Sequence, residues 1–235
     1  MRGKLIVFEG VEGSGKTTQL ARSRDWLLGG GMRSCLGTLR DQISVVVTRE
    51  PGGTALGLGL RKLLLEDGRR QDDVTPTPAP IQDRAELLLY AADRAQHVEE
   101  FLKPMLAKGV IILCDRYTDS TVAYQGYGRG LDLNLIQQLN QIATDGLESD
   151  LTLWLDIDAK TGLKRAQQRG AADRMEQADL DFHRRVQQGF THLASTYPQR
   201  IVRIDASKTE EEVHLVIQKI LRQRMNEWFQ KLSRP

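Results

Sequence analysis

The stretch Gly10-Val-Glu-Gly-Ser-Gly-Lys16-Thr17 decides the fold class of this chain of 235 residues. It has the form G-x-x-x-x-G-K-[ST], in which glycines let the backbone curl so that its N–H groups point at phosphate oxygens. An apolar run precedes it, and a helical pattern that places Leu20, Ala21, Leu27 and Leu28 on one face follows it. A strand, a glycine-rich loop and a helix in this order predict a nucleoside triphosphate site rather than a chance glycine-rich turn before a lysine.

The loop also predicts which of its residues act on the nucleotide. Lys16 is expected to reach the β- and γ-phosphates as a catalytic cation, and the Thr17 hydroxyl to bind the Mg²⁺ that accompanies ATP. Glu12 is unusual here, because phosphates repel a carboxylate; a loop residue that faces solvent is the alternative. The expected ATP-binding residues are Gly10, Val11, Glu12, Gly13, Ser14, Gly15, Lys16, Thr17 and Thr18.

The rest of the chain alternates short apolar runs with longer amphipathic stretches, which is the pattern of βαβ units. The predicted strands, nearly continuous in Val, Ile and Leu, are Lys4–Glu9, Val45–Thr48, Val110–Cys114, Leu151–Asp156 and Ile201–Ile204. Two further helical faces are predicted, one with Leu135, Leu139 and Ile142 and one with Val213, Ile217 and Ile220. We therefore expect an α/β, three-layer P-loop NTPase fold with a five-stranded parallel sheet flanked by helices. Residues 29–44 and 66–81 are expected to be surface excursions.

Composition excludes several classes of protein. Lys and Arg number 33 and Asp and Glu 31, a balance that points to no nucleic-acid or membrane partner. The apolar runs are strand-sized, and the one near the start is too short for a signal peptide. Cys35 and Cys114 form no C-x-x-C pair, which favours a reducing compartment. We expect a cytoplasmic protein.

The phosphate loop leaves the class of enzyme open. A GTPase switch needs an N-K-x-D motif that the sequence lacks, and a motor or transport ATPase needs coupling domains for which there is no room. A small-molecule kinase needs a second site for its acceptor. Candidate segments for it are Thr48-Arg-Glu-Pro-Gly-Gly-Thr54, Tyr90-Ala-Ala-Asp-Arg94-Ala-Gln96, and Asp115-Arg-Tyr117 followed by Ser120-Thr121 and Tyr124-Gln125-Gly126. They start at, or face, the carboxyl ends of strands, where open α/β sheets bind ligands.

In order and context these segments closely resemble the thymidylate kinase family, and the resemblance runs from Lys4 to the last helix. It implies one P-loop nucleoside monophosphate kinase domain, residues 1–235, that moves the γ-phosphoryl group of ATP to dTMP for dTTP synthesis. ATP and dTMP are the implied partners, Mg²⁺ the cofactor and a homodimer the assembly. The alternatives are a related kinase with another acceptor and an inactive ATP-binding regulatory protein.

The resemblance implies roles at the acceptor site. Tyr90 stacks on thymine, Arg94 and Thr121 bond the base, and Tyr124 crowds the 2′ side of the sugar. Arg116 grips the acceptor phosphate, which suits a bidentate guanidinium. The expected substrate-binding residues are Glu50, Pro51, Arg61, Tyr90, Arg94, Arg116, Ser120, Thr121, Tyr124 and Gln125. By residue type alone, a core aromatic is the favoured interpretation of Tyr90 and a solvated helix charge that of Arg94, and the motif reverses this preference. A solvated helix charge is also the alternative for Arg61.

Two further assignments follow from the resemblance. Asp115 is the expected carboxylate ligand of Mg²⁺, with an internal ion pair to an arginine as the alternative, and Glu12 is placed towards the acceptor as a catalytic residue. The phosphate loop holds no arginine, which matches the bacterial pattern with catalytic arginines in a lid, here about 160–175. Arg169 is the first choice and Arg165 and Arg174 come next; a solvated basic helix is the alternative.

Overall fold

The computed structural model describes residues 2–31, 44–65, 80–168 and 174–229. Its centre is a five-stranded, wholly parallel sheet in the order β2-β3-β1-β4-β5. The strands are β1 Lys4–Glu9, β2 Val45–Arg49, β3 Ile111–Asp115, β4 Leu151–Asp156 and β5 Ile201–Asp205. The predicted α/β fold is confirmed, with strand ends that differ by no more than one residue from those predicted.

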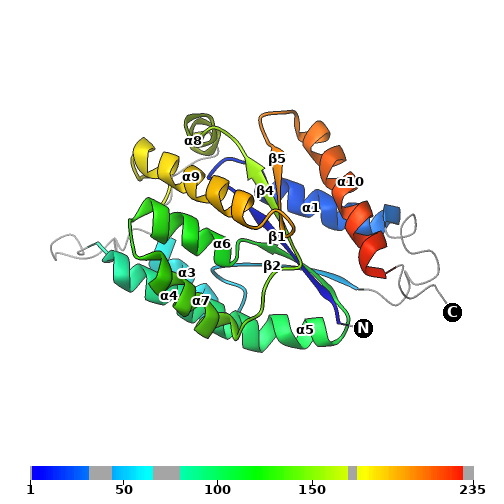
Figure 1. Ribbon diagram of the computed structural model, residues 1–235, viewed down its shortest axis with the longest axis horizontal. Helices are drawn as coiled ribbons and strands as arrows, with labels where there is room; N and C mark the ends of the chain where they lie inside the picture. Colours follow the sequence, from blue (N-terminus) through cyan, green and yellow to red (C-terminus); the bar gives the residue numbers. More distant parts are fainter. Residues whose placement is uncertain (1, 32–43, 66–79, 169–173, 230–235) are drawn as a thin grey trace, which may run out of the picture.

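Helices cover both faces of the sheet (Figure 1). On one side lie α1 Lys16–Trp26, α8 Ala159–Gln167, α9 Leu180–Thr196 and α10 Glu210–Phe229. On the other lie α3 Ala55–Leu65, α4 Asp83–His97, α5 Lys103–Ala107 and α7 Leu133–Thr144. The short α6 Thr118–Thr121 and the π-helical segments η1 Leu27–Gly31, η3 Val98–Leu102 and η4 Val122–Gly128 complete the described helices.

The alternation of side chains along β1 divides the core between the two faces of the sheet. Ile6 and Phe8 belong to a large cluster with residues of α1, α9 and α10. Leu5 and Val7 point the other way, into a smaller cluster with residues of η3 and α5. These four side chains of β1 are fully buried, as expected for a parallel strand with helices on each side. The three-layer arrangement thus follows directly from one apolar strand.

Two predicted helix faces need correction. Leu20 and Leu27 are buried as predicted, but Leu28 is 49% exposed; it lies beyond the end of α1 at Trp26, just before the chain kinks at Gly30. On α7, Leu135 and Ile142 are 41% and 76% exposed, while Ile136 and Ala143 face the core. The apolar periodicity of α7 was real, but the face it marks points away from the sheet. On α10, Val213 and Ile217 are buried as predicted.

Most of the two predicted surface excursions, and residues 169–173 of the predicted lid, lie outside the described residues. The site is positioned by the end of the sheet at which β1, β2 and β3 finish. The phosphate loop follows β1, the Glu50–Gly53 turn follows β2, and the Arg116–Ser120 turn follows β3.

Candidate active site

The phosphate loop curls around the ammonium group of Lys16. Lys16 Nζ donates hydrogen bonds to the carbonyls of Gly10 and Val11, both at 3.0 Å, and to Ser14 Oγ at 3.4 Å. Burial and the neighbouring Arg116 guanidinium lower the pKa of Lys16. The loop predicted from sequence is thus wound with its lysine at the centre.

A close backbone approach ties this loop to the helix that leads into the lid. Gly13 has φ +70°, and a Cβ there would lie 2.0 Å from the carbonyl oxygen of Gly162 in α8. A Cβ on Gly162 would in turn lie 2.4 Å from the carbonyl oxygen of Glu12. Any side chain at either position would collide with backbone, so only glycine fits both places.

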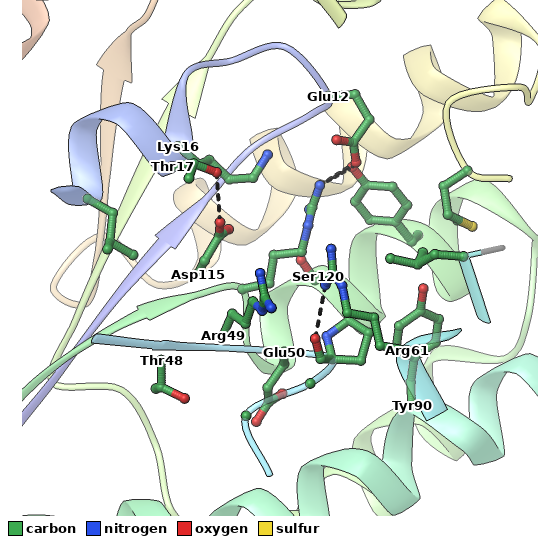
Figure 2. A pocket seen from close by; sticks show the side chains of 18 of the residues that line it. Glu12, Lys16, Thr17, Thr48, Arg49, Glu50, Arg61, Tyr90, Asp115 and Ser120 are labelled. Carbon is green, nitrogen blue, oxygen red and sulfur yellow. Dashed lines mark hydrogen bonds and ion pairs between the residues drawn. The ribbon is translucent and has the colours of Figure 1, made fainter. Parts of the chain in front are cut away.

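A cavity of about 590 Å³ opens beyond the carboxyl ends of β1, β2 and β3 (Figure 2). It brings together most of the predicted site. The predicted residues that line it are Glu12, Gly13, Gly15, Lys16, Thr17, Thr18, Glu50, Pro51, Arg61, Tyr90, Arg94, Asp115, Arg116, Ser120, Thr121, Tyr124 and Gln125. Gly10, Val11 and Ser14 belong to the same loop without lining the cavity. The motif residues therefore meet at one place, as strand topology requires.

The predicted metal ligands meet at the mouth of the phosphate loop. Thr17 Oγ1 donates to Asp115 Oδ2 at 3.2 Å, while the buried Asp115 Oδ1 receives no hydrogen bond from the described residues. Asp115 also forms no ion pair with an arginine in the part of the chain that the structure describes, so the alternative reading of this carboxylate is not supported. A hydroxyl and a carboxylate with an unsatisfied oxygen are the hard donors that Mg²⁺ prefers, so these residues fit the ion.

Arg116, the residue predicted to bind the acceptor phosphate, is hydrogen-bonded to both the phosphate loop and the turn after β3. Its guanidinium donates to the Gly10 carbonyl and Ser120 Oγ at 3.1 Å each and to Tyr124 Oη at 3.0 Å, and it pairs with Glu12. Burial disfavours the charged form of both groups, but their pairing outweighs it. The pairing raises the pKa of Arg116 above its ordinary value. The Arg116 and Lys16 cations lower the pKa of Glu12 to about 2. Glu12 is therefore an ionised partner of Arg116, not a loop residue facing solvent.

The residues predicted to bind the base are organised around Arg94 on α4, which is almost fully buried. Arg94 Nε donates to Glu50 Oε2, and Nη1 donates to Thr121 Oγ1 and Asn140 Oδ1, all at 2.8 Å. The second oxygen of Glu50 lies 2.9 Å from His97 Nδ1. Arg94 is thus a fixed, charged group in the wall of the cavity and not a solvated helix charge.

Arg49 is a cavity residue that the sequence interpretation missed. It ends β2 directly opposite Asp115 and lines the cavity together with Arg61, whose Nη1 donates to the Pro51 carbonyl at 3.0 Å. Figure 2 shows Arg49 and Arg61 beside the Glu50 turn, with Tyr90 approaching from α4. The signal was present, since Arg49 stands inside the quoted Thr48–Thr54 motif at a strand end.

The lid arginines divide among three situations. Arg169 lies outside the described residues. Arg165 donates to the Ala206 carbonyl at 3.1 Å and does not line the cavity. Arg174 donates to the Leu64 carbonyl at 2.9 Å and pairs with the buried Glu86, so it fastens the end of the lid to α3 and α4.

The parallel sheet carries a phosphate loop with its lysine, a hydroxyl and a carboxylate suited to Mg²⁺, and an arginine-lined cavity beside them. This combination defines a P-loop kinase. A family model described as thymidylate kinase matches residues 8–217. The chain belongs to the thymidylate kinase family.

Individual relatives agree over the full length. A thymidylate kinase of Cyanothece sp. is 57% identical over 242 residues, which cover 99% of each chain. One of Nostoc punctiforme is 60% identical over 223 residues, 94% of this chain and 97% of the relative. The crystal structure of thymidylate kinase from Ehrlichia chaffeensis matches with a TM-score of 0.69 at 33% identity, covering 94% of this chain and all of that one. Among the described residues, no helix has the length and apolar character needed to cross a membrane.

Proposed function

We propose that this member of the family transfers the γ-phosphoryl group of ATP to dTMP, giving ADP and dTDP, with the donor on the phosphate loop and the acceptor in the adjoining cavity. The observation that carries this proposal is the position of Arg116, whose guanidinium contacts the Gly10 carbonyl of the phosphate loop. An acceptor phosphate bound by Arg116 is thereby held next to the donor, which is the geometry that phosphoryl transfer needs.

The donor side uses the loop backbone, Lys16 and the N-terminus of α1. The loop N–H groups and the helix dipole hold the phosphates, and Lys16 neutralises charge on the transferring group. Thr17 and Asp115 would hold Mg²⁺, which when bound neutralises phosphate charge and orients the β- and γ-phosphates. From the lid, Arg169 is our first assignment for the catalytic arginine.

The acceptor phosphate is bound by Arg116, with Arg49 and Arg61 lining the same cavity. Glu12 and Tyr124 hold the Arg116 fork in place before the acceptor arrives, so less orientation is lost when it binds. A general base is not needed, because the second pKa of a phosphomonoester is about 6 and the acceptor is already largely ionised at neutral pH.

The base and sugar are bound at the other end. Tyr90 stacks on thymine, Arg94 and Thr121 bond its polar edge, and Tyr124 excludes a 2′-hydroxyl. Arg94 is held by Glu50, Thr121, Asn140 and a backbone carbonyl, which leaves one N–H of Nη2 in a fixed position for the base. Pro51, Ser120 and Gln125 complete the wall.

A coupled assay of ADP release tests the proposal with ATP, Mg²⁺ and a panel of dTMP, dUMP, TMP, dCMP, dGMP and AMP. We expect a strong preference for dTMP. Rapid turnover of another monophosphate would favour a related kinase and remove the base-reading roles of Tyr90, Arg94 and Thr121. ATP binding without turnover of any acceptor would favour the inactive regulatory protein.

We also propose that the protein is a cytoplasmic homodimer built from single kinase domains. Large apolar side chains are exposed on α7 and the neighbouring α4, among them Leu135, Ile142 and Leu88. An apolar face of this kind on two packed helices is typical of a subunit interface. Sedimentation equilibrium should give twice the chain mass, and Ile142→Glu should give the monomer.

A further inference from the structure

Glu9 ends β1 and immediately precedes the phosphate loop, yet neither the motifs nor the cavity lining includes it. Its side chain is fully buried. A buried carboxylate is costly unless hydrogen bonds compensate for the lost water. Where those bonds go therefore indicates what the residue does.

All the side-chain hydrogen bonds of Glu9 among the described residues go to residues 117–120, the turn in which the chain leaves β3 and begins α6. Oε1 accepts from the backbone N–H of Tyr117 at 2.8 Å and of Ser120 at 3.1 Å. Oε2 accepts from Ser120 Oγ at 2.6 Å. One carboxylate thus clamps both ends of the 117–120 turn, which lies 108 residues further along the chain.

Arg116 directly precedes the clamped turn, and its backbone is strained. Its φ is +70°, in the left-handed region that side-chain-bearing residues rarely adopt. Such a conformation persists only where the surroundings enforce it, and it is common at functional sites. The clamp on one side, and the bond from Arg116 N to the Phe8 carbonyl at 3.0 Å on the other, provide that enforcement.

The clamp also reaches the Arg116 guanidinium. Ser120 Oγ donates to Glu9 and accepts from Arg116 Nη1 at 3.1 Å. The same Nη1 donates to the carbonyl of Gly10, the residue after Glu9, and Lys16 Nζ donates to that carbonyl too. Glu9 therefore sits where the acceptor arginine and the donor loop are fastened together.

We propose that Glu9 is a positioning residue for phosphoryl transfer, whose carboxylate locks the 117–120 turn and so fixes the Arg116 guanidinium against the phosphate loop. This inference rests on the proposed function, since it concerns the distance between donor and acceptor phosphates. Burial, with Asp119 adding to it and Arg116 opposing it, raises the pKa of Glu9 to about 7, as befits a carboxylate held inside the protein.

The test measures kcat, KM for dTMP, KM for ATP and Tm in the full-length protein. Glu9→Ala removes the clamp and should lower kcat about 100-fold, the cost of a misplacement near 1 Å, and raise KM for dTMP. KM for ATP should stay near its wild-type value, because Lys16 and the loop carbonyls are untouched. Glu9→Gln keeps an acceptor for the two N–H groups and should restore most of kcat.

Asp156 provides the matched control. It is a buried carboxylate that ends the neighbouring strand β4 and accepts from Gln187 and Arg203, away from the cavity. Asp156→Ala should lower Tm and leave kcat and both KM values unchanged. A Glu9→Ala variant with wild-type kcat and KM for dTMP would overturn the proposal. It would also be overturned if Asp156→Ala lost as much kcat as Glu9→Ala for the same fall in Tm.

Ser120→Ala in the wild type and in Glu9→Ala gives a second, independent measurement. If Ser120 acts on Arg116 through Glu9, its removal should cost far less kcat in Glu9→Ala, where the clamp is already lost, than in the wild type. Fully additive losses would overturn the relay. If Glu9→Ala does not fold, Ser120→Ala alone should still raise KM for dTMP and leave KM for ATP unchanged, and an unchanged KM for dTMP would overturn the relay. A wild-type protein that fails to turn over dTMP would refute the proposed function itself, a result distinct from any pattern among the variants.

Discussion

Glu12 Oε1 receives hydrogen bonds from both the Arg116 guanidinium and the Tyr124 hydroxyl, so one carboxylate of the phosphate loop orients two residues of the proposed acceptor site. A carboxylate in a phosphate loop looked unfavourable from sequence alone. The structure explains it, because the cations Arg116 and Lys16 outweigh the repulsion that such a carboxylate would otherwise meet.

The pKa of Glu12 predicts an acid dependence of stability. Because its folded-state pKa is lowered to about 2, the carboxylate stabilises the fold above its unfolded pKa, and that stabilisation is lost as the pH falls towards 2. In urea unfolding between pH 3 and 6, the free energy of unfolding of the wild type should rise with pH more steeply than that of Glu12→Gln. The difference should be level above about pH 6. Parallel curves would contradict the pairing.

Arg116→Lys should be a poor substitute. A single ammonium group cannot contact Gly10, Ser120, Glu12 and Tyr124 together, so the cation is no longer held in one place for the acceptor phosphate. We expect kcat/KM for dTMP to fall roughly 10- to 100-fold, the value of one or two charged hydrogen bonds. Near-native steady-state kinetics would remove the role assigned to Arg116.

Lys16→Ala should cost several orders of magnitude in kcat. Near-native steady-state kinetics in this variant would remove the role assigned to Lys16.

Tyr124 offers a way to separate ring from hydroxyl. Its ring packs edge-on against Phe182 and Phe190, so its place is fixed without the hydroxyl. Tyr124→Phe should therefore keep the preference for dTMP over TMP and raise KM for dTMP, because Arg116 and Glu12 lose a partner. Tyr124→Ala should relax the sugar preference. Competition assays with dTMP and TMP measure this preference in each variant. An unchanged preference in Tyr124→Ala would show that the ring does not exclude the 2′-hydroxyl.

Removal of Mg²⁺ should stop turnover, and addition of Mg²⁺ after chelation should restore it. Asp115→Asn keeps the size of the side chain and removes its charge, so it should shift the Mg²⁺ titration of kcat to higher concentration. The Kd for ATP measured without Mg²⁺ should be nearly the same for Asp115→Asn as for the wild type. A titration that coincides with the wild type would show that Asp115 is not a ligand.

The lid arginines should separate by readout. Arg174 pairs with Glu86, which also accepts from Gln125 and Arg129. Arg174→Ala should therefore lower Tm, since it removes one partner of a buried carboxylate. Arg169→Ala should lower kcat with little change in Tm. The reverse pattern, measured by thermal denaturation and steady-state kinetics, would exchange the two roles.

The sheet could be predicted because strands buried on both faces are continuously apolar, and β1 and β4 need no tertiary information to be recognised. The apolar face of α7 was a different matter. Leu135 and Ile142 have the periodicity of a core face, and sequence alone does not say whether such a face meets the sheet or another surface.

Much of the candidate site could be predicted from motifs that begin at strand ends. Arg49 was missed although it stands in such a motif, and Glu9 was missed for a different reason. It closes an apolar run, and its partners, Tyr117 and Ser120, become neighbours only when β1 and β3 pair. Arg169 and the rest of 169–173 lie outside the described residues, so the choice of lid arginine stays a prediction.

The contact between Gly13 and Gly162 has a consequence for how this enzyme tolerates change. A substitution in most tight places can be compensated when the neighbour shrinks. Here the neighbour on each side is a backbone carbonyl, which no substitution can make smaller. A change in the backbone path of the phosphate loop therefore requires a matching change in the backbone of α8. A lid taken from another kinase would have to be transferred together with the phosphate loop of that kinase.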